Sequence, residues 1–182
     1  MALKFFVAPK SNGRASNGQT PKTVKGTLEV NDNGRIMFQD RFLKEIGFDA
    51  KTMKIAFCFD DEGAQEAAII VLTDEVSAAG VEGFVLKPKS ITSSKLRDQF
   101  YALWSPSKVE LDTYARDEEG ITLRDDQGNP IVSGSESRYN RLMFRIKENI
   151  DIEGLVGYKL EFIGEREPVG ERIYDFSPGK RK

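Results

Sequence analysis

The chain has 182 residues and a formal net charge of −2, and 39% of its residues are hydrophobic and 31% charged. These values are typical of a globular chain with a core of its own, and they exclude the disordered and fibrous classes. The chain has no histidine and a single cysteine, Cys58, so it lacks the usual general base, the commonest metal ligand and any intrachain disulfide. We therefore expect no enzyme activity, no cofactor and no metal site.

The first 22 residues predict a flexible, basic N-terminal arm. Residues 8–22 are rich in Gly, Ser, Asn and Pro, and residues 1–28 carry five basic residues and no acidic one. The apolar stretch 3–7 fits a short strand that docks on a neighbouring subunit, which predicts a homo-oligomer. It is too short for a signal peptide, and no apolar run is long enough to cross a bilayer. We expect a cytoplasmic protein with no membrane partner.

From residue 23 the pattern changes to short strands separated by turns. Alternating residues, Asn- and Gly-rich turns and apolar runs predict two hairpins, a short helix with Gly47 at its C-terminal end, and one further strand. In chain order these elements are the strands 23–30 and 35–38, the helix 40–47, and the strands 53–59, 67–73 and 83–86.

The rest of the chain predicts one more helix and several more short strands. The helix covers about residues 94–103, with Ser93 or Ser94 as its N-cap and Pro106 beyond its end. The strands are expected at residues 109–114, 121–123, 131–132, 142–146, 158–163 and 172–176, with a mobile loop at 133–137. The predicted fold class is mainly β (β-rich α+β), a small barrel of short strands with two short helices.

Acidic and basic residues are separated along the chain. Residues 180–182 are all basic, and removing these three and the five N-terminal positive charges from the net of −2 leaves −10 for residues 29–179. The acidic clusters at 60–62, 117–119 and 125–126 lie at predicted turns, where carboxylates solvate loops, so we assign no catalytic residue. The basic ends either contact phosphates or an acidic partner, or they are solvated tails.

These patterns divide the chain into four predicted parts. They are the basic arm 1–22, a β-rich barrel domain 23–123, a β-rich C-terminal extension 124–176 and a basic tail 177–182. An offset of 54 residues inside the barrel domain brings Ile46 onto Phe100 and Lys54 onto Lys108. Residues 28–73 and 82–123 are therefore interpreted as an internal repeat of helix, short link and strand, and chance matching of two helix–strand units is the alternative.

One motif consists of a strand, the turn Asn31-Asp32-Asn33 before Gly34-Arg35, and a short helix ending in Ile46-Gly47. It resembles the swapped-hairpin domain of the AbrB/SpoVT type, in a duplicated form like that of MraZ. The family's strand-ending proline is Gln39 here, one of its two basic helix residues is Leu43, and the second copy has no Gly-Arg. The resemblance implies an internal pseudo-dimer of swapped hairpins that binds duplex DNA as a transcription regulator or antitoxin.

The resemblance also implies which residues contact DNA. Arg35 is the main candidate, Arg41 and Lys44 are supporting phosphate contacts, and Arg97 is their counterpart in the second copy. The alternative for Arg35 is an ion pair with Asp32 or Asp40. The two basic ends add candidates for non-specific contacts with nucleic acid, namely Lys10, Arg14, Lys180 and Arg181.

Three functions remain open at the level of the sequence. The first is nucleic-acid binding by a duplex-DNA regulator, which the charge of −10 on residues 29–179 opposes unless positive residues gather on one face. The second is a structural or assembly protein of a virus particle, with the N-terminal arm exchanged between subunits. The third is an acidic inhibitor that binds a host nucleic-acid enzyme. Single-strand binding is a variant of the first, with Phe38, Phe57, Tyr101 and Trp104 as stacking candidates whose alternative place is the core.

Overall fold

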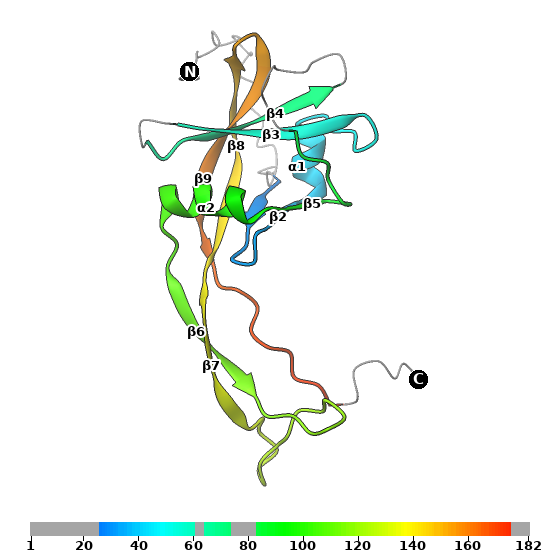
Figure 1. The fold of residues 1–182 in the computed structure, drawn as a ribbon, viewed down its shortest axis with the longest axis vertical. Helices are drawn as coiled ribbons and strands as arrows, with labels where there is room; N and C mark the ends of the chain where they lie inside the picture. The colour runs from blue at the N-terminus through cyan, green and yellow to red at the C-terminus, as the bar shows by residue number, and fades with distance from the viewer. Residues whose placement is uncertain (1–25, 61–63, 74–82, 176–182) are drawn as a thin grey trace, which may run out of the picture.

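The computed structural model describes residues 26–60, 64–73 and 83–175 and shows a mainly β protein with two helices (Figure 1). Most of the strands form one curled sheet, and two strands extend away from it. In chain order the elements are β1 (Leu28–Val30), β2 (Arg35–Phe38), α1 (Asp40–Glu45), β3 (Met53–Phe59), β4 (Ala67–Thr73), β5 (Ser90–Thr92), α2 (Ser94–Trp104), β6 (Lys108–Tyr114), β7 (Val132–Tyr139), β8 (Arg141–Ile152) and β9 (Leu155–Arg166). The expected mainly β fold class is confirmed.

The large sheet has seven antiparallel strands in the order β3-β4-β9-β8-β1-β2-β5 and curls into a half-barrel. The long hairpin β8–β9 lies in its middle, between β4 and β1. β8 and β9 come from the predicted C-terminal extension, and the other five strands come from the predicted barrel domain. The sheet therefore joins these two parts of the chain by backbone hydrogen bonds.

The core lies on the concave side of the half-barrel. Phe42 of α1 and Leu96, Phe100 and Trp104 of α2 belong to the same buried cluster as inward residues of the sheet. Phe100 is fully buried at the centre of an aromatic group, where its ring packs against those of Phe57, Phe59, Trp104 and Phe144. The two helices thus cover one face of the sheet. On β3, β4 and β8, residues that alternate with those of this core form a second, smaller buried cluster, made of Ala56, Cys58, Ala68, Ile70, Leu72, Ile150 and Ile152.

Local signals explain where these elements begin and end. The Ser93 hydroxyl accepts a hydrogen bond from the backbone N–H of Leu96 at 3.2 Å, so the predicted N-cap of α2 is confirmed. Gly34 and Gly47 have φ values of +79° and +62°, which suit the predicted turn between β1 and β2 and the end of α1. The predicted hairpin of residues 53–59 and 67–73 is confirmed as β3–β4.

Four expectations about strands and loops are wrong. Residues 121–123 form no strand, and only Thr122 makes an isolated bridge, with Arg116. Residues 83–86 contribute only an isolated bridge between Phe84 and Ile55, and the strand forms instead at Ser90–Thr92, where β2 offers a free edge. Residues 133–137 belong to β7 because they pair with β6 along its length. No strand is present at residues 172–175, which pair with a turn instead, and residue 176 lies outside the described part.

The predicted repeat corresponds to two runs of strand, helix and strand. α1 and β3 follow β2, and α2 and β6 follow β5. β2 and β5 pair with each other antiparallel, with Ile36 opposite Ile91. The last strands differ in place, because β3 ends the seven-stranded sheet while β6 pairs with β7 outside it. The two copies therefore have the same element order in different surroundings.

Gly26 is a point where the chain passes too close to α1 for any side chain. A Cβ at this position would lie 2.0 Å from the backbone nitrogen of Phe42. We expect Gly26→Ala to shift α1 and to lower the melting temperature by roughly 5 °C. Overpacking of this kind lowers the free energy of unfolding by about 1–3 kcal/mol, which accounts for the shift in melting temperature. Gly170→Ala is the control, because no atom lies within 4 Å of the added carbon. Equal melting temperatures for the two variants would contradict the close approach.

Candidate nucleic-acid interface

Basic residues are concentrated in two segments that meet where β2 pairs with β5, at one end of the sheet. Residues 35–44 and 83–97 run through this region, and backbone pairing of β2 with β5 holds them side by side. Together they contain seven basic residues and one acidic residue, Asp40. The basic residues of this surface, which we name the basic edge, are Arg35, Arg41, Lys44, Lys87, Lys89, Lys95 and Arg97.

Two of the seven cations are held by neighbouring groups. Lys89 pairs with Asp40 at 2.6 Å. Arg97 pairs with Asp98 at 2.6 Å and donates to the backbone carbonyl of Asp32 at the same distance, which ties α2 to the β1–β2 turn. The other five are exposed, and none of them forms an ion pair with another residue of the described ranges. They are available to an anionic ligand.

The predicted DNA-contacting residues lie within this surface. Arg35 begins β2, Arg41 and Lys44 lie on α1, and Arg97 lies on the first turns of α2. The expected alternative for Arg35, an ion pair with Asp32 or Asp40, is not formed. Lys10, Arg14, Lys180 and Arg181 lie outside the described residues.

Sequence reasoning missed three lysines that lie before α2 and at its start. The structure adds Lys87, Lys89 and Lys95 to the predicted residues, because β5 brings residues 83–97 against β2. A signal was present, since these 15 residues contain four basic residues and no acidic one. Sequence alone did not show that β5 pairs with β2.

The outer face of the sheet next to the basic edge holds a buried carboxylate. Glu29 of β1 is only 7% exposed, and its oxygens lie 3.5 Å from Arg141 and 3.9 Å from Arg166. A buried charge is tolerated when it is paired, and these two arginines compensate the negative charge of Glu29. The five exposed cations of the basic edge are therefore more available to a ligand than the two arginines of β8 and β9 beside Glu29.

A pocket of about 610 Å³ lies between α2 and the end of β7. Its charged side chains are balanced, because Arg97 is paired with Asp98 and Arg138 is paired with Glu136. Burial raises the pKa of Tyr101, whose ring packs edge-on against Tyr139. The pocket adds no net positive charge to the surface. It is lined by Asp32, Arg97, Asp98, Tyr101, Ala102, Ser105, Pro106, Ser137, Arg138 and Tyr139.

The hairpin β6–β7 with its connecting turns, residues 108–139, projects away from the half-barrel (Figure 1). We name it the hairpin arm. At its foot, Glu165 of β9 accepts hydrogen bonds from the Asn140 side-chain amide at 2.9 Å and from the Ser107 backbone N–H at 3.1 Å. These bonds lower the pKa of Glu165 and anchor both strands of the arm to the sheet.

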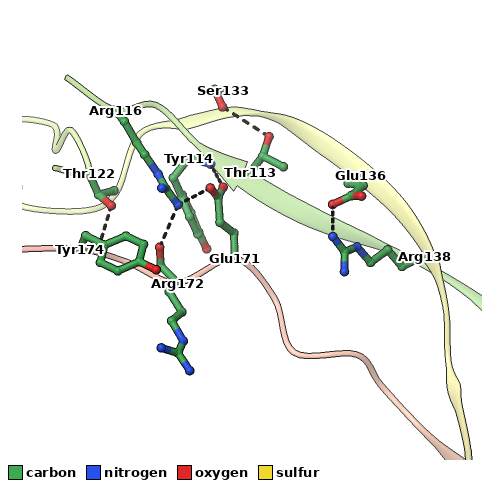
Figure 2. A network of polar contacts seen from close by, with 10 residues as sticks. All are labelled: Thr113, Tyr114, Arg116, Thr122, Ser133, Glu136, Arg138, Glu171, Arg172 and Tyr174. Carbon is green, nitrogen blue, oxygen red and sulfur yellow. Dashed lines mark hydrogen bonds and ion pairs between the residues drawn. The ribbon is translucent and has the colours of Figure 1, made fainter. Parts of the chain in front are cut away.

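The segment after β9, residues 167–175, runs along the hairpin arm to its far end (Figures 1 and 2). We name it the C-terminal strap. Glu171 accepts a hydrogen bond from the Tyr114 backbone N–H at 2.7 Å and pairs with Arg116, whose guanidinium lies 4.8 Å from the Tyr174 ring centroid. Thr122 and Tyr174 exchange two hydrogen bonds of 2.8 and 2.9 Å. The strap therefore fastens the arm's end.

Removing the Glu171 carboxylate should loosen this end of the arm. We expect Glu171→Ala to speed amide hydrogen exchange roughly tenfold at residues 112–124. A change of this size corresponds to the stability lost with one charge-assisted hydrogen bond. Exchange in β8 should stay unchanged. Glu167→Ala removes an exposed strap carboxylate that makes no ion pair within the described residues, and it should leave exchange as in the parent protein. Equal protection in both variants would contradict a fastening role for Glu171.

The aromatic residues considered for single-strand stacking are structural. Phe38 and Trp104 are buried in the core, and Phe57 and Tyr101 are partly buried against it. Cys58 is buried as well, and burial followed by the charge of Glu153 raises its pKa to about 11, so the thiol is protonated at neutral pH. None of these side chains is placed to stack on a base or to act as a nucleophile.

The described ranges are residues 26–60, 64–73 and 83–175. No cluster of three or more cysteine or carboxylate side chains there could hold a metal ion. No helix there is long and apolar enough to cross a membrane.

The resemblance to AbrB-type domains stays a prediction. Comparison of the chain with protein-family models, with curated proteins and with solved structures gave no match.

Proposed function

We propose that the protein binds nucleic acid, with duplex DNA preferred, through the basic edge. The observation that carries this proposal is the local charge, since residues 35–44 and 83–97 have seven basic residues against one acidic residue. Five of these cations are exposed and have no ion-pair partner in the described ranges, so a phosphate would not have to displace a carboxylate from them. Lysine and arginine side chains of this kind bind phosphate by charge and by hydrogen bonds.

The distribution of charge removes the main objection to this function. The described residues outside the hairpin arm and the strap contain 14 basic and 13 acidic residues, so the half-barrel is nearly neutral. Much of the negative charge lies on the arm and the strap, which extend away from the sheet (Figure 1). A duplex at the basic edge would therefore meet a locally positive surface.

The preference for duplex over single strands follows from the aromatic residues. Proteins that bind single strands without sequence preference stack bases on exposed aromatic rings. Phe38, which lies on β2 beside the basic edge, is 3% exposed, and Phe84 is packed against the core. Phosphate contacts are therefore the main source of affinity, and a duplex presents phosphates at the higher density.

The proposal is tested by fluorescence anisotropy with random duplex and single-stranded oligonucleotides at about 50 mM salt. We expect the parent protein to bind the duplex. Arg35→Ala and Lys95→Ala, each made alone, should weaken the affinity roughly threefold to tenfold, because each removes one phosphate contact. Lys147→Ala is the matched control, because Lys147 is an exposed cation of β8 outside the basic edge. No binding of duplex at low salt, or equal losses in all three variants, would overturn the proposal.

A further inference from the structure

We propose that the hairpin arm of one copy docks on the basic edge of a second copy of this chain, so that the protein assembles head to tail. This interaction goes beyond nucleic-acid binding, and it does not require that function to hold. The arm's lack of a core, its charge and its direction support this contact.

The hairpin arm buries little of its own surface. No residue of β6 or β7 belongs to either buried cluster of the described residues. A two-stranded hairpin is marginally stable alone in water, and this one extends for about 23 Å, the length of seven strand residues. The foot contacts and the strap hold it in place, but they leave much of its surface free.

Apolar side chains are exposed at the arm's far end. Leu123, Ile131 and Val132 lie on paired segments there, and Ile173 of the strap lies beside them next to Tyr174. Their exposed fractions are 41%, 40%, 53% and 44%. These side chains are available for apolar contacts with another protein, and a contiguous patch of them would mark such a contact.

The charge of the arm complements the charge of the basic edge. The hairpin arm has eight acidic and four basic residues, and the strap has three acidic and one basic, which together give a charge of −6. The basic edge, with seven basic residues and one acidic residue, has a charge of +6. Charge complementarity of this kind steers encounter and fixes orientation between protein surfaces.

The basic edge also offers apolar contacts between its cations. Met37 of β2 is 37% exposed, and Val85 is 49% exposed. Each surface therefore combines exposed apolar side chains with a net charge, which is negative on the arm and positive on the edge. Both halves of the interface are present in the same chain, which identifies a second copy as the occupant.

The direction of the arm makes the contact intermolecular. The arm projects away from the half-barrel that carries β2 and β5, so its far end does not meet its own basic edge (Figure 1). Where the contact is not reciprocated between the same two copies it is heterologous, and it produces closed rings or open filaments. If the proposed function holds, nucleic acid and the arm compete for one surface.

Glu110 and Asp112 are the arm residues best suited to a test. They are exposed and have no ion pair with another described residue. Asp112 lines a small pocket between the arm and the strap, and Glu110 does not. The hydrogen bonds and ion pairs that fasten the arm to the strap come from Tyr114, Arg116, Thr122 and Arg124, so reversing the charge of Glu110 and Asp112 removes none of them.

The experiment is sedimentation velocity of the full chain across concentration at about 50 and 500 mM salt. We expect species heavier than the 20.4 kDa chain at low salt and the single chain at high salt. The arm variant Glu110→Lys with Asp112→Lys should associate at least about tenfold more weakly, and so should the edge variant Lys87→Glu with Lys95→Glu. Mixing the two variants should restore association, because each then offers a complementary partner for the other.

Two results would overturn the inference. The first is a single chain at every concentration at low salt, and the second is an equimolar mixture that stays dissociated. The control Lys147→Glu with Glu153→Lys keeps the net charge and both surfaces, and it should assemble like the parent protein. Nucleic-acid binding is measured separately on the arm variant, whose basic edge is intact. Its failure to bind would count against the proposed function and not against assembly.

Discussion

Replacing Phe100 with alanine is expected to lower the free energy of unfolding by about 4 kcal/mol, the usual cost of removing a buried aromatic ring. Phe100 is fully buried, and it joins α2 to both halves of the sheet through rings of β3 and β8. Its neighbours are held by backbone pairing and cannot close the cavity. Urea unfolding, followed by circular dichroism at high salt, measures the difference.

Val156→Ala is the control for this substitution. Val156 lies on β9 but is 62% exposed, so its truncation should change the free energy of unfolding by less than about 0.5 kcal/mol. A loss below about 1.5 kcal/mol for Phe100→Ala would contradict a single core that depends on α2.

Reversing three charges of the basic edge should have the largest effect on binding. In the variant Arg35→Glu with Lys87→Glu and Lys95→Glu, three attractive contacts with phosphate are replaced by repulsion. We expect duplex affinity at about 50 mM salt to fall at least roughly a hundredfold. The three residues are exposed and lie on β2, before β5 and on α2, so the variant should unfold like the parent protein.

A matched triple variant separates local charge from net charge. Lys147→Glu, Lys51→Glu and Arg172→Glu reverse three exposed cations outside the basic edge. The two triple variants have the same net charge, so a similar loss of duplex affinity in both would show that binding depends on total charge rather than on this surface.

The first half of the fold could be predicted because its signals are local. The Asn-rich turn before Gly34, the Ser93 cap and the apolar runs of β3 and β4 each determine an element by short-range chemistry. The hairpin arm could not be predicted in this way. Residues 133–137 are polar and small, so they show no strand pattern, and only pairing with β6 makes them a strand.

The candidate surface was partly visible in the sequence. Arg35, Arg41 and Lys44 could be proposed because they lie close together in the chain around one turn and one helix. Lys87 and Lys95 could not be assigned to the same site from the sequence. They come near Arg35 only because the three-residue edge strand β5 pairs with β2, which is more than fifty residues away in the chain. Short strands carry little sequence signal, and their pairing is a property of the whole sheet.

The salt dependence of duplex binding tests the central claim most directly. Five free cations at the basic edge predict that log K falls with log salt concentration at a slope of about −4 to −5. Removing two of them in Lys87→Ala with Lys95→Ala should reduce the slope to about −3, while Lys147→Ala should leave it unchanged. A slope near zero, or a slope that the double variant does not alter, would contradict nucleic-acid binding at this surface.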